Sequence, residues 1–129
     1  MDKIEKTNDQ WKKELDPETY HVTREGGTEA PFTGKYFNTH EEGVYKCSNC
    51  GLELFSSDTK FDSGTGWPSF WNPIKPDAVV LQEDISLGET RIEVLDVCGG
   101  HLGHVFDDGP QPTGKRYCMN SGALVFVPE

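Results

Sequence analysis

The chain has 129 residues, of which 22 are Asp or Glu and 12 are Lys or Arg, so its formal net charge is -10 at pH 7. A surface this negative repels phosphate backbones and disfavours non-specific nucleic-acid binding. We expect one domain over residues 1–129. The sequence has no apolar run of about 18 residues and no apolar run behind its first residues, so we expect neither a membrane span nor a secretory signal.

Helical signals are confined to residues 1–30, which we expect to form a helical arm packed on the rest of the chain. Trp11 and Leu15 are four residues apart, the spacing of one helix face, with Thr7-Asn8 ahead of them as caps. Asp16-Pro17-Glu18 is the start signature of a second helix: a cap, a proline at the first helical position and an acid in the first turn. Both helices are too short to persist without tertiary contacts.

From residue 43 onward, short runs rich in β-branched and aromatic residues alternate with turn residues, and no helical period of useful length occurs. This pattern predicts a mainly β protein with antiparallel sheets, arranged as a sandwich or a barrel. The candidate strands are Val44–Cys47, Leu52–Phe55, Ala78–Gln82, Arg91–Val97, His104–Phe106, Arg116–Met119 and Ala123–Val127.

The four cysteines indicate a reducing, cytoplasmic compartment, where metal or catalytic chemistry is expected rather than a disulfide framework. Cys47 and Cys50 have the C-x-x-C spacing of a zinc knuckle. Cys98 is a candidate third ligand, and spacing leaves His101 and Asp96 open as the fourth. The alternative is a pair of buried or redox-active thiols, although a thioredoxin-type role requires a βαβ context that this sequence lacks.

Histidines, acids, an arginine, an asparagine and a cysteine crowd into residues 101–120. Residues two apart in a strand point to one face, so Arg116, Cys118 and Asn120 are expected to share a face. A guanidinium beside a thiol lowers the thiol pKa, which activates a cysteine nucleophile. A lone strand cysteine is more often a small buried hydrophobe, but a buried strand does not normally gather charged groups without a polar task.

Trp67 lies on a glycine-flanked loop, where it can wall a small pocket that accepts a methyl or sulfur group, or simply fill the core. Two other function classes stay open. One is a structural zinc module that binds a protein partner, which gives no reason for the polar face around Cys118. The other is a cysteine hydrolase, which needs an oxyanion hole for which the sequence offers no clear loop.

Together these stretches resemble the B-type methionine-R-sulfoxide reductase (MsrB) family. The likeness covers about residues 8–128 and is carried by Gly34–Tyr36, Cys47–Cys50 with Leu54-Phe55, Lys60–Phe70, His101–Pro110 and Arg116–Ser121. The resemblance implies two antiparallel sheets in a β-tent arrangement with short N-terminal helices. It also implies a peptide-methionine (R)-S-oxide reductase that acts on protein-bound or free sulfoxide; cells use one enzyme for each sulfoxide epimer.

The resemblance further implies a role for each matching residue. Cys118 is implied as the nucleophile that becomes a sulfenic acid, and Thr65 stands where many members have a resolving cysteine, so an external thiol such as thioredoxin is expected to regenerate the enzyme. The active-site polar groups are His101, His104, Asp108, Arg116 and Asn120, the substrate-methyl pocket is Trp67 and Phe106, and the ligands of a structural zinc are Cys47, Cys50 and Cys98. The spacing before His101 departs from the family pattern, which leaves the fourth ligand open. We expect a cytoplasmic monomer that binds neither nucleic acid nor membranes.

Overall fold

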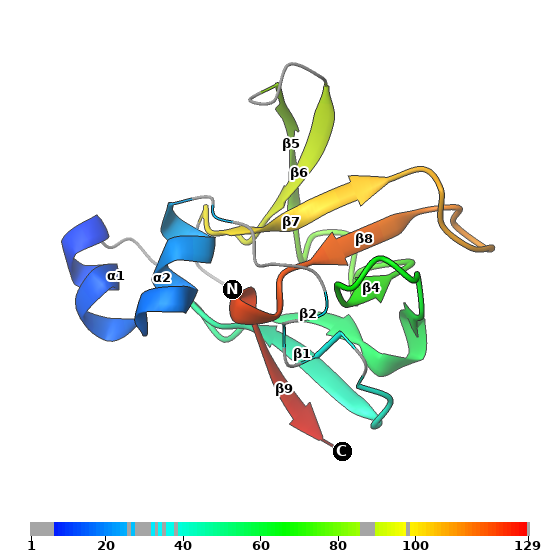
Figure 1. Cartoon of the computed structure of the whole chain (residues 1–129), viewed down its shortest axis with the longest axis horizontal. Helices are drawn as coiled ribbons and strands as arrows, with labels where there is room; N and C mark the ends of the chain where they lie inside the picture. Colours follow the sequence, from blue (N-terminus) through cyan, green and yellow to red (C-terminus); the bar gives the residue numbers. More distant parts are fainter. Residues whose placement is uncertain are drawn as a thin grey trace.

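The computed structural model describes residues 7–25, 27, 32, 34, 36–37, 39–85, 90–97 and 99–128. Two antiparallel sheets make up most of the fold, as predicted (Figure 1). The three-stranded sheet has the order β2-β1-β9 and the six-stranded sheet the order β3-β4-β8-β7-β6-β5. Their bounds are β1 Gly43–Cys47, β2 Glu53–Ser56, β3 Lys60–Phe61, β4 Ser69–Phe70, β5 Val80–Asp84, β6 Arg91–Leu95, β7 His101–Phe106, β8 Arg116–Met119 and β9 Leu124–Pro128.

Every strand expected from the sequence is present, and the differences lie at the ends. The largest is in β7, which begins at His101 rather than His104. The sequence pattern missed β3 and β4, which have two residues each, because alternation cannot be recognised over so short a run. β4 matters for function because it pairs with β8 next to Cys118.

The two expected helices form where their capping signals lie. α1, Asn8–Glu14, begins with a capping box between Thr7 and Gln10, and α2, Pro17–Arg24, begins with the Asp16 carboxylate accepting from the Thr19 amide. α2 packs against β7 and against the 3-10 turn η2, Ser121–Ala123. Neither helix is long and apolar enough to cross a membrane, and the described residues contain no other α-helix.

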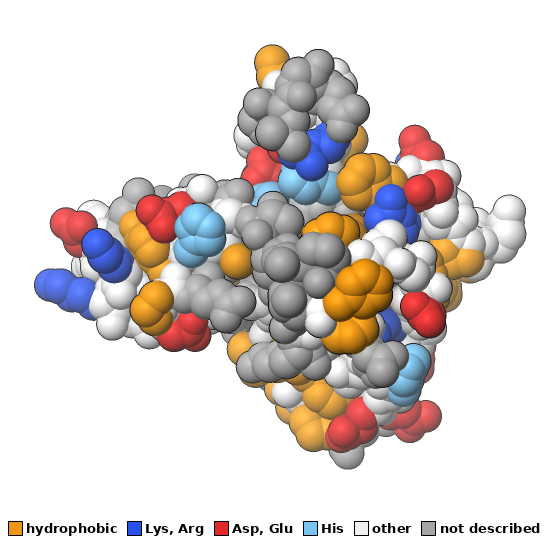
Figure 2. Space-filling model, viewed as in Figure 1, with side chains coloured by type: hydrophobic (Ala, Val, Ile, Leu, Met, Phe, Trp, Pro, Cys, Tyr) orange, Lys and Arg blue, Asp and Glu red, His pale blue; other side chains and the backbone are white. Residues whose placement is uncertain are grey.

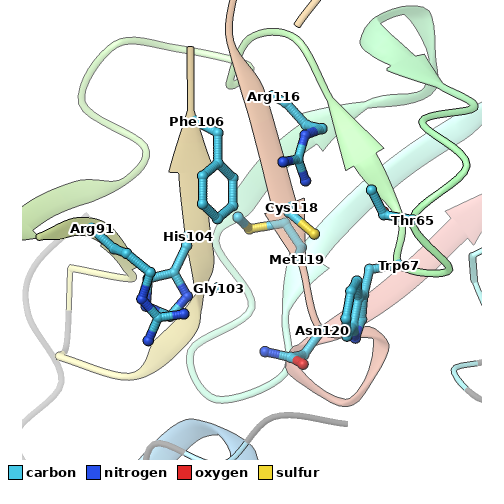
Figure 3. Close-up of a pocket in the computed structure, with 10 residues that line it drawn as sticks. All are labelled: Thr65, Trp67, Arg91, Gly103, His104, Phe106, Arg116, Cys118, Met119 and Asn120. Carbon is cyan, nitrogen blue, oxygen red and sulfur yellow. The ribbon is translucent and has the colours of Figure 1, made fainter. Parts of the chain in front are cut away.

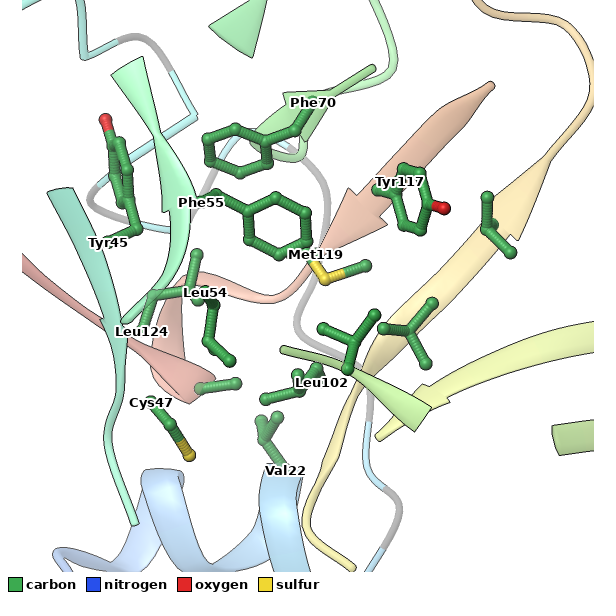
Figure 4. Packing of buried hydrophobic residues seen from close by; sticks show 14 residues of the cluster. Val22, Tyr45, Cys47, Leu54, Phe55, Phe70, Leu102, Tyr117, Met119 and Leu124 are labelled. Atoms are coloured by element: carbon green, nitrogen blue, oxygen red, sulfur yellow. The ribbon is translucent and has the colours of Figure 1, made fainter. Parts of the chain in front are cut away.

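The core lies where side chains of the two sheets meet, as Figure 4 shows. Phe55 of β2 stacks on Phe70 of β4 with ring centroids 4.4 Å apart, and Tyr45 of β1 meets Phe70 edge-on at 5.0 Å. Val22 brings α2 into the same cluster, which anchors a helix that could not persist alone. This packing holds β8, the strand that carries Cys118, in a fixed place.

Strand register sets which side chains surround Cys118. On one side of β8, His104 of β7 lies directly opposite Cys118, and Phe106 lies opposite Arg116. On the other side, Ser69 of β4 is the partner of Cys118. In the space-filling view, hydrophobic side chains gather beside a cationic side chain over β7 and β8 (Figure 2). Cys118 therefore lies in the middle of the six-stranded sheet, flanked by strands on both sides.

Candidate active site

A cavity of about 250 Å³ opens beside Cys118 (Figure 3). β8 contributes Arg116 and Cys118, and Asn120 follows directly after the strand, so the structure brings together the three side chains that the strand spacing places on one face. The lining residues are Thr65, Trp67, Arg91, Gly103, His104, Phe106, Arg116, Cys118, Met119 and Asn120.

The Cys118 thiol does not have the depressed pKa expected from the sequence. Burial raises the pKa of Cys118 above its ordinary value, and this effect outweighs the neighbouring guanidinium of Arg116 and the hydrogen bonds from Thr65 and Arg116, which lower it. The expectation of a net lowered pKa was therefore wrong, because spacing along a strand says nothing about how much water the fold removes from a sulfur.

Arg116 is held in place by an acid and an aromatic ring. The Asp108 carboxylate accepts from Nε of Arg116 at 2.9 Å and from its Nη2 at 3.1 Å, and the guanidinium carbon lies 4.3 Å from the Phe106 ring centroid. The hydrogen bond from Arg116 lowers the pKa of Asp108, so this acid stays ionised. Asp108 is itself exposed and is not among the described residues that line the cavity, so it acts on the site through Arg116.

The two histidines occupy different positions. Nε2 of His104 lies 2.8 Å from an oxygen of Asp84, and the same oxygen accepts from Arg91 at 3.3 Å. His101 is buried, and its Nδ1 lies 2.6 Å from Glu93. Burial lowers the pKa of His101. Of the two, only His104 is among the described residues lining the cavity.

Two aromatic side chains flank Cys118 in Figure 3. Phe106 comes from β7, and Trp67 comes from the loop before β4. Gly64 and Gly66 in this loop have φ values of 74° and 91°, a left-handed conformation that suits glycine, and they bracket Thr65. The loop can therefore turn sharply and present both Thr65 and Trp67 to the cavity. An apolar wall on each side of a thiol suits a small methyl-bearing group.

Sequence reasoning missed a group of polar residues at the cavity, of which Arg91 is among the described residues that line it. Asp84 and Arg91 face each other across the β5–β6 pair, and Glu93 is opposite His104 across the β6–β7 pair. Arg91 and Glu93 alternate with apolar residues in the predicted strand Arg91–Val97, whereas Asp84 lies beyond the predicted strand Ala78–Gln82. Which histidine each acid meets depends on register, which the sequence alone did not supply.

A second cluster lies away from this cavity. The sulfurs of Cys47 and Cys50 and a carboxylate oxygen of Asp96 all lie within 4.8 Å of one another, so these residues could hold a metal ion. Cys47 Sγ is 2.8 Å from the Asp96 carboxylate, which is 1% exposed. Hydrogen bonding to Cys50, followed by burial and the charge of Asp96, raises the pKa of Cys47. This donor set fits a bound metal.

The structure also separates the two candidates for the fourth ligand. Asp96 belongs to the cluster with Cys47 and Cys50, whereas His101 is hydrogen-bonded to Glu93 and is in ring contact with His104. Cys98, the third cysteine expected as a ligand, lies outside the described residues. The structure thus brings together two of the expected ligands and adds Asp96 to them.

Comparison with known proteins agrees with this geometry. A family model described as "SelR domain" matches residues 15–128. A protein of Methanosarcina barkeri named "Peptide methionine sulfoxide reductase MsrB" is 60% identical over 127 residues, which is 98% of this chain and 89% of that protein. The chain belongs to the MsrB family. MsrB proteins of Agrobacterium fabrum and Leptospira interrogans are each 54% identical over 98% of this chain, covering 94% and 97% of their own lengths. The family resemblance seen in the sequence is confirmed.

Proposed function

We propose that this chain, as a single reductase domain, reduces methionine-R-sulfoxide in oxidised proteins to methionine. The observation that carries the proposal is the position of the Cys118 thiol, between two aromatic walls and beside cationic and amide donors. The names of its relatives support the same substrate class. We further propose that the enzyme is a cytoplasmic monomer.

In the proposed complex, Trp67 and Phe106 hold the substrate methyl group, which leaves the sulfoxide sulfur facing Cys118. Apolar walls favour the methyl over any hydrated group of similar size. The sulfoxide oxygen then points toward the polar side of the cavity, where His104 and Asn120 can donate to it. Orienting the oxygen in this way selects one epimer, because the mirror arrangement would direct the oxygen into an aromatic wall.

The proposed chemistry transfers the oxygen from one sulfur to the other. The Cys118 thiolate attacks the substrate sulfur, and His104 donates a proton to the oxygen as the S–O bond weakens. The attack forms a bond between the two sulfurs, and the hydroxyl then moves to Cys118 as that bond and the substrate S–O bond break. The substrate sulfur thereby gains two electrons and leaves as methionine, while Cys118 loses two electrons and becomes a sulfenic acid. Arg116, steadied by Asp108, favours the charged form of Cys118 against the effect of burial.

We propose that an external thiol, such as that of thioredoxin, reduces the sulfenic acid, releasing water and passing through a mixed disulfide. The residue at the position of the usual resolving cysteine is Thr65, and Cys47 and Cys50 belong to the separate metal cluster. Thiol titration after one equivalent of substrate tests this step. The expected product has a modified Cys118 and no internal disulfide, and an internal disulfide would refute the one-cysteine cycle.

We propose zinc as the metal of the Cys47, Cys50 and Asp96 cluster, with Cys98 as a further ligand. Bound zinc would supply a structural cross-link. It takes no part in the proposed reaction, whose groups all lie in the other cluster of residues.

Turnover of separated R and S epimers of a methionine sulfoxide peptide tests the function. We expect the wild-type chain to consume the R epimer and Cys118→Ser to consume neither. Ser57→Ala is a suitable control, because Ser57 lies in the turn after β2 and accepts a hydrogen bond from the Gly43 amide, away from the cavity. Equal turnover of the S epimer, or activity in Cys118→Ser, would exclude the proposed function.

A further inference from the structure

A line of three hydroxyl groups runs from the backbone to the Cys118 thiol. Ser69 donates to the carbonyl oxygen of Trp67 at 3.1 Å, and its hydroxyl lies 2.8 Å from that of Ser63. The Ser63 hydroxyl lies 2.7 Å from that of Thr65, whose side chain is hydrogen-bonded to Cys118. Ser69 is fully buried, and Ser63 and Thr65 are partly buried, so the line is shielded from bulk water.

When Ser69 donates to the Trp67 carbonyl, proton counting sets the direction of the other bonds in this line. Each hydroxyl has a single proton to donate. Because Ser69 uses its proton on the Trp67 carbonyl, Ser63 must donate to Ser69, and Thr65 must then donate to Ser63. In this direction the Thr65 oxygen is left as an acceptor, which can receive the S–H of a Cys118 thiol. This direction of the chain therefore suits the thiol form of Cys118.

The thiolate form needs the opposite direction, because a thiolate can only accept. We propose that the Ser69–Ser63–Thr65 chain reverses its hydrogen bonds when Cys118 ionises, so that Thr65 donates to the sulfur, Ser63 to Thr65 and Ser69 to Ser63. Only hydroxyl protons rotate, so the heavy atoms stay in place. This inference deepens the proposed function, since it concerns the same thiol, but its test needs no sulfoxide substrate.

The two directions differ by one hydrogen bond. In the proposed thiol form there are four: Cys118 to Thr65, Thr65 to Ser63, Ser63 to Ser69, and Ser69 to the Trp67 carbonyl. The thiolate form has three, because Ser69 releases the Trp67 carbonyl. The anchoring at Ser69 and Trp67 thus favours the thiol, whereas the hydroxyl of Thr65 favours the thiolate, since a bond to a charged sulfur is stronger than one from a weak S–H donor.

Other charged groups around Cys118 stay the same in the variants that test this chain. Arg116 lies on the same strand, His104 faces Cys118 from β7, and Arg91 of β6 lines the cavity. Asp108 acts through its ion pair with Arg116. None of these groups takes part in the hydrogen bonds that link Ser69, Ser63 and Thr65. Replacing a chain hydroxyl therefore changes the hydrogen bonds of Cys118 without changing its charged neighbours.

The experiment measures the pKa of Cys118 as the midpoint of iodoacetamide alkylation against pH. Trypsin cleavage after Arg116 gives a peptide of residues 117–129, in which Cys118 is the only cysteine, so mass spectrometry follows this thiol alone. Thr65→Val should raise the midpoint by about one pH unit, because the thiolate loses its donor. Thr65→Ser should restore the wild-type value.

A shift of the alkylation midpoint in the opposite direction, in a second variant, identifies the reversal of the hydrogen bonds. Ser69→Ala removes the anchoring of the chain to the Trp67 carbonyl, so the midpoint should fall by about half a unit. Ser63→Ala should also lower it, and Ser57→Ala should leave it unchanged. Thermal unfolding checks that each variant is folded. A rise in both Ser69→Ala and Ser63→Ala, or no change in either, overturns the proposal, whether or not the chain reduces sulfoxides.

Discussion

The six-stranded sheet carries Asp84 on β5, His104 on β7 and Cys118 on β8. His104 is opposite Cys118 in the β7–β8 register, and its far ring nitrogen is 2.8 Å from Asp84. An ionised carboxylate accepts the Nε2 proton, which fixes the orientation of the ring, and the protonated ring then has the Nδ1 proton to donate. Asp84 is thus a positioning residue for the proposed proton donor, although it is not among the described residues lining the cavity.

We predict that Asp84→Asn lowers kcat for R-sulfoxide reduction about tenfold or more with little change in KM, because His104 loses the acceptor that orients it. Glu83→Gln is a matched control, since Glu83 is exposed on the same strand. Steady-state kinetics on the two variants test whether Asp84 positions His104. A KM effect without a kcat effect would mean that Asp84 contributes to substrate binding instead.

The pKa of Cys118 gives a second prediction at this scale. Burial raises this pKa, so the thiolate fraction at neutral pH is smaller than that of an unfolded cysteine. We expect the pH midpoint of Cys118 alkylation in the folded chain to exceed that of the free peptide of residues 117–129, and denaturant should remove the difference. A folded midpoint below that of the peptide would show that Arg116 outweighs burial.

The β7–β8 pair is the element on which the site depends, and Gly103 allows its close approach. A Cβ built on Gly103 would lie 2.0 Å from the Cys118 carbonyl oxygen and 2.9 Å from the Met119 Cα. Both are backbone atoms, so no side-chain movement can relieve the overlap. The glycine is therefore needed for strands β7 and β8 to bring His104 and Cys118 opposite each other.

We predict that Gly103→Ala destabilises the protein by about 1–3 kcal/mol or more, as overpacking of a fixed backbone does, and sharply lowers activity. Chemical denaturation and R-sulfoxide turnover measure the two effects. The contrasting variant is Gly51→Ala, where a Cβ meets nothing within 4 Å and only the φ of 76° is unfavourable. Full activity in Gly103→Ala would contradict the role given to this close approach.

The helix α2 gives a prediction that tests the N-terminal packing. Asp16 caps this helix by accepting from both the amide and the hydroxyl of Thr19 at 3.0 Å. We expect Asp16→Ala to cost about 1 kcal/mol of stability, measured by denaturation, while activity per folded molecule stays unchanged. Loss of activity without loss of stability would indicate that α2 affects the cavity directly.

At the scale of the whole molecule, the cluster of Cys47, Cys50 and Asp96 joins the two sheets. Cys47 ends β1 in the three-stranded sheet, and Asp96 follows β6 in the six-stranded sheet. A metal held by both would therefore cross-link the sheets. Such a cross-link stabilises the folded state, because the ligand set exists only there.

We predict about one zinc per chain and a fall in Tm of about 10 °C or more after chelation or in Cys50→Ser, since a few kcal/mol of lost stability has about this effect in a domain of this size. Elemental analysis and calorimetry provide the readouts. Cys118→Ser, outside the cluster, should keep both the zinc and the Tm. Zinc-free wild-type protein with an unchanged Tm would refute a structural metal.

The sequence by itself determined the features that depend on neighbouring residues. The alternation of residue types located the longer strands, and capping residues located both helix starts. The two-residue spacing of Arg116, Cys118 and Asn120 predicted that they share a face, and all three line one cavity. The family followed from motifs that are continuous in the chain. None of these features requires knowledge of which strand lies beside which.

The tertiary structure alone decided the features that depend on register and burial. It placed Asp96 with Cys47 and Cys50, gave His104 rather than His101 to the cavity, and brought Asp84 to His104. It also reversed the expected direction of the Cys118 pKa shift, because water removed by all the surrounding strands outweighs one neighbouring charge. Register and burial depend on contacts between segments that are far apart in the sequence. Local spacing does not report these contacts, so only the folded structure determines them.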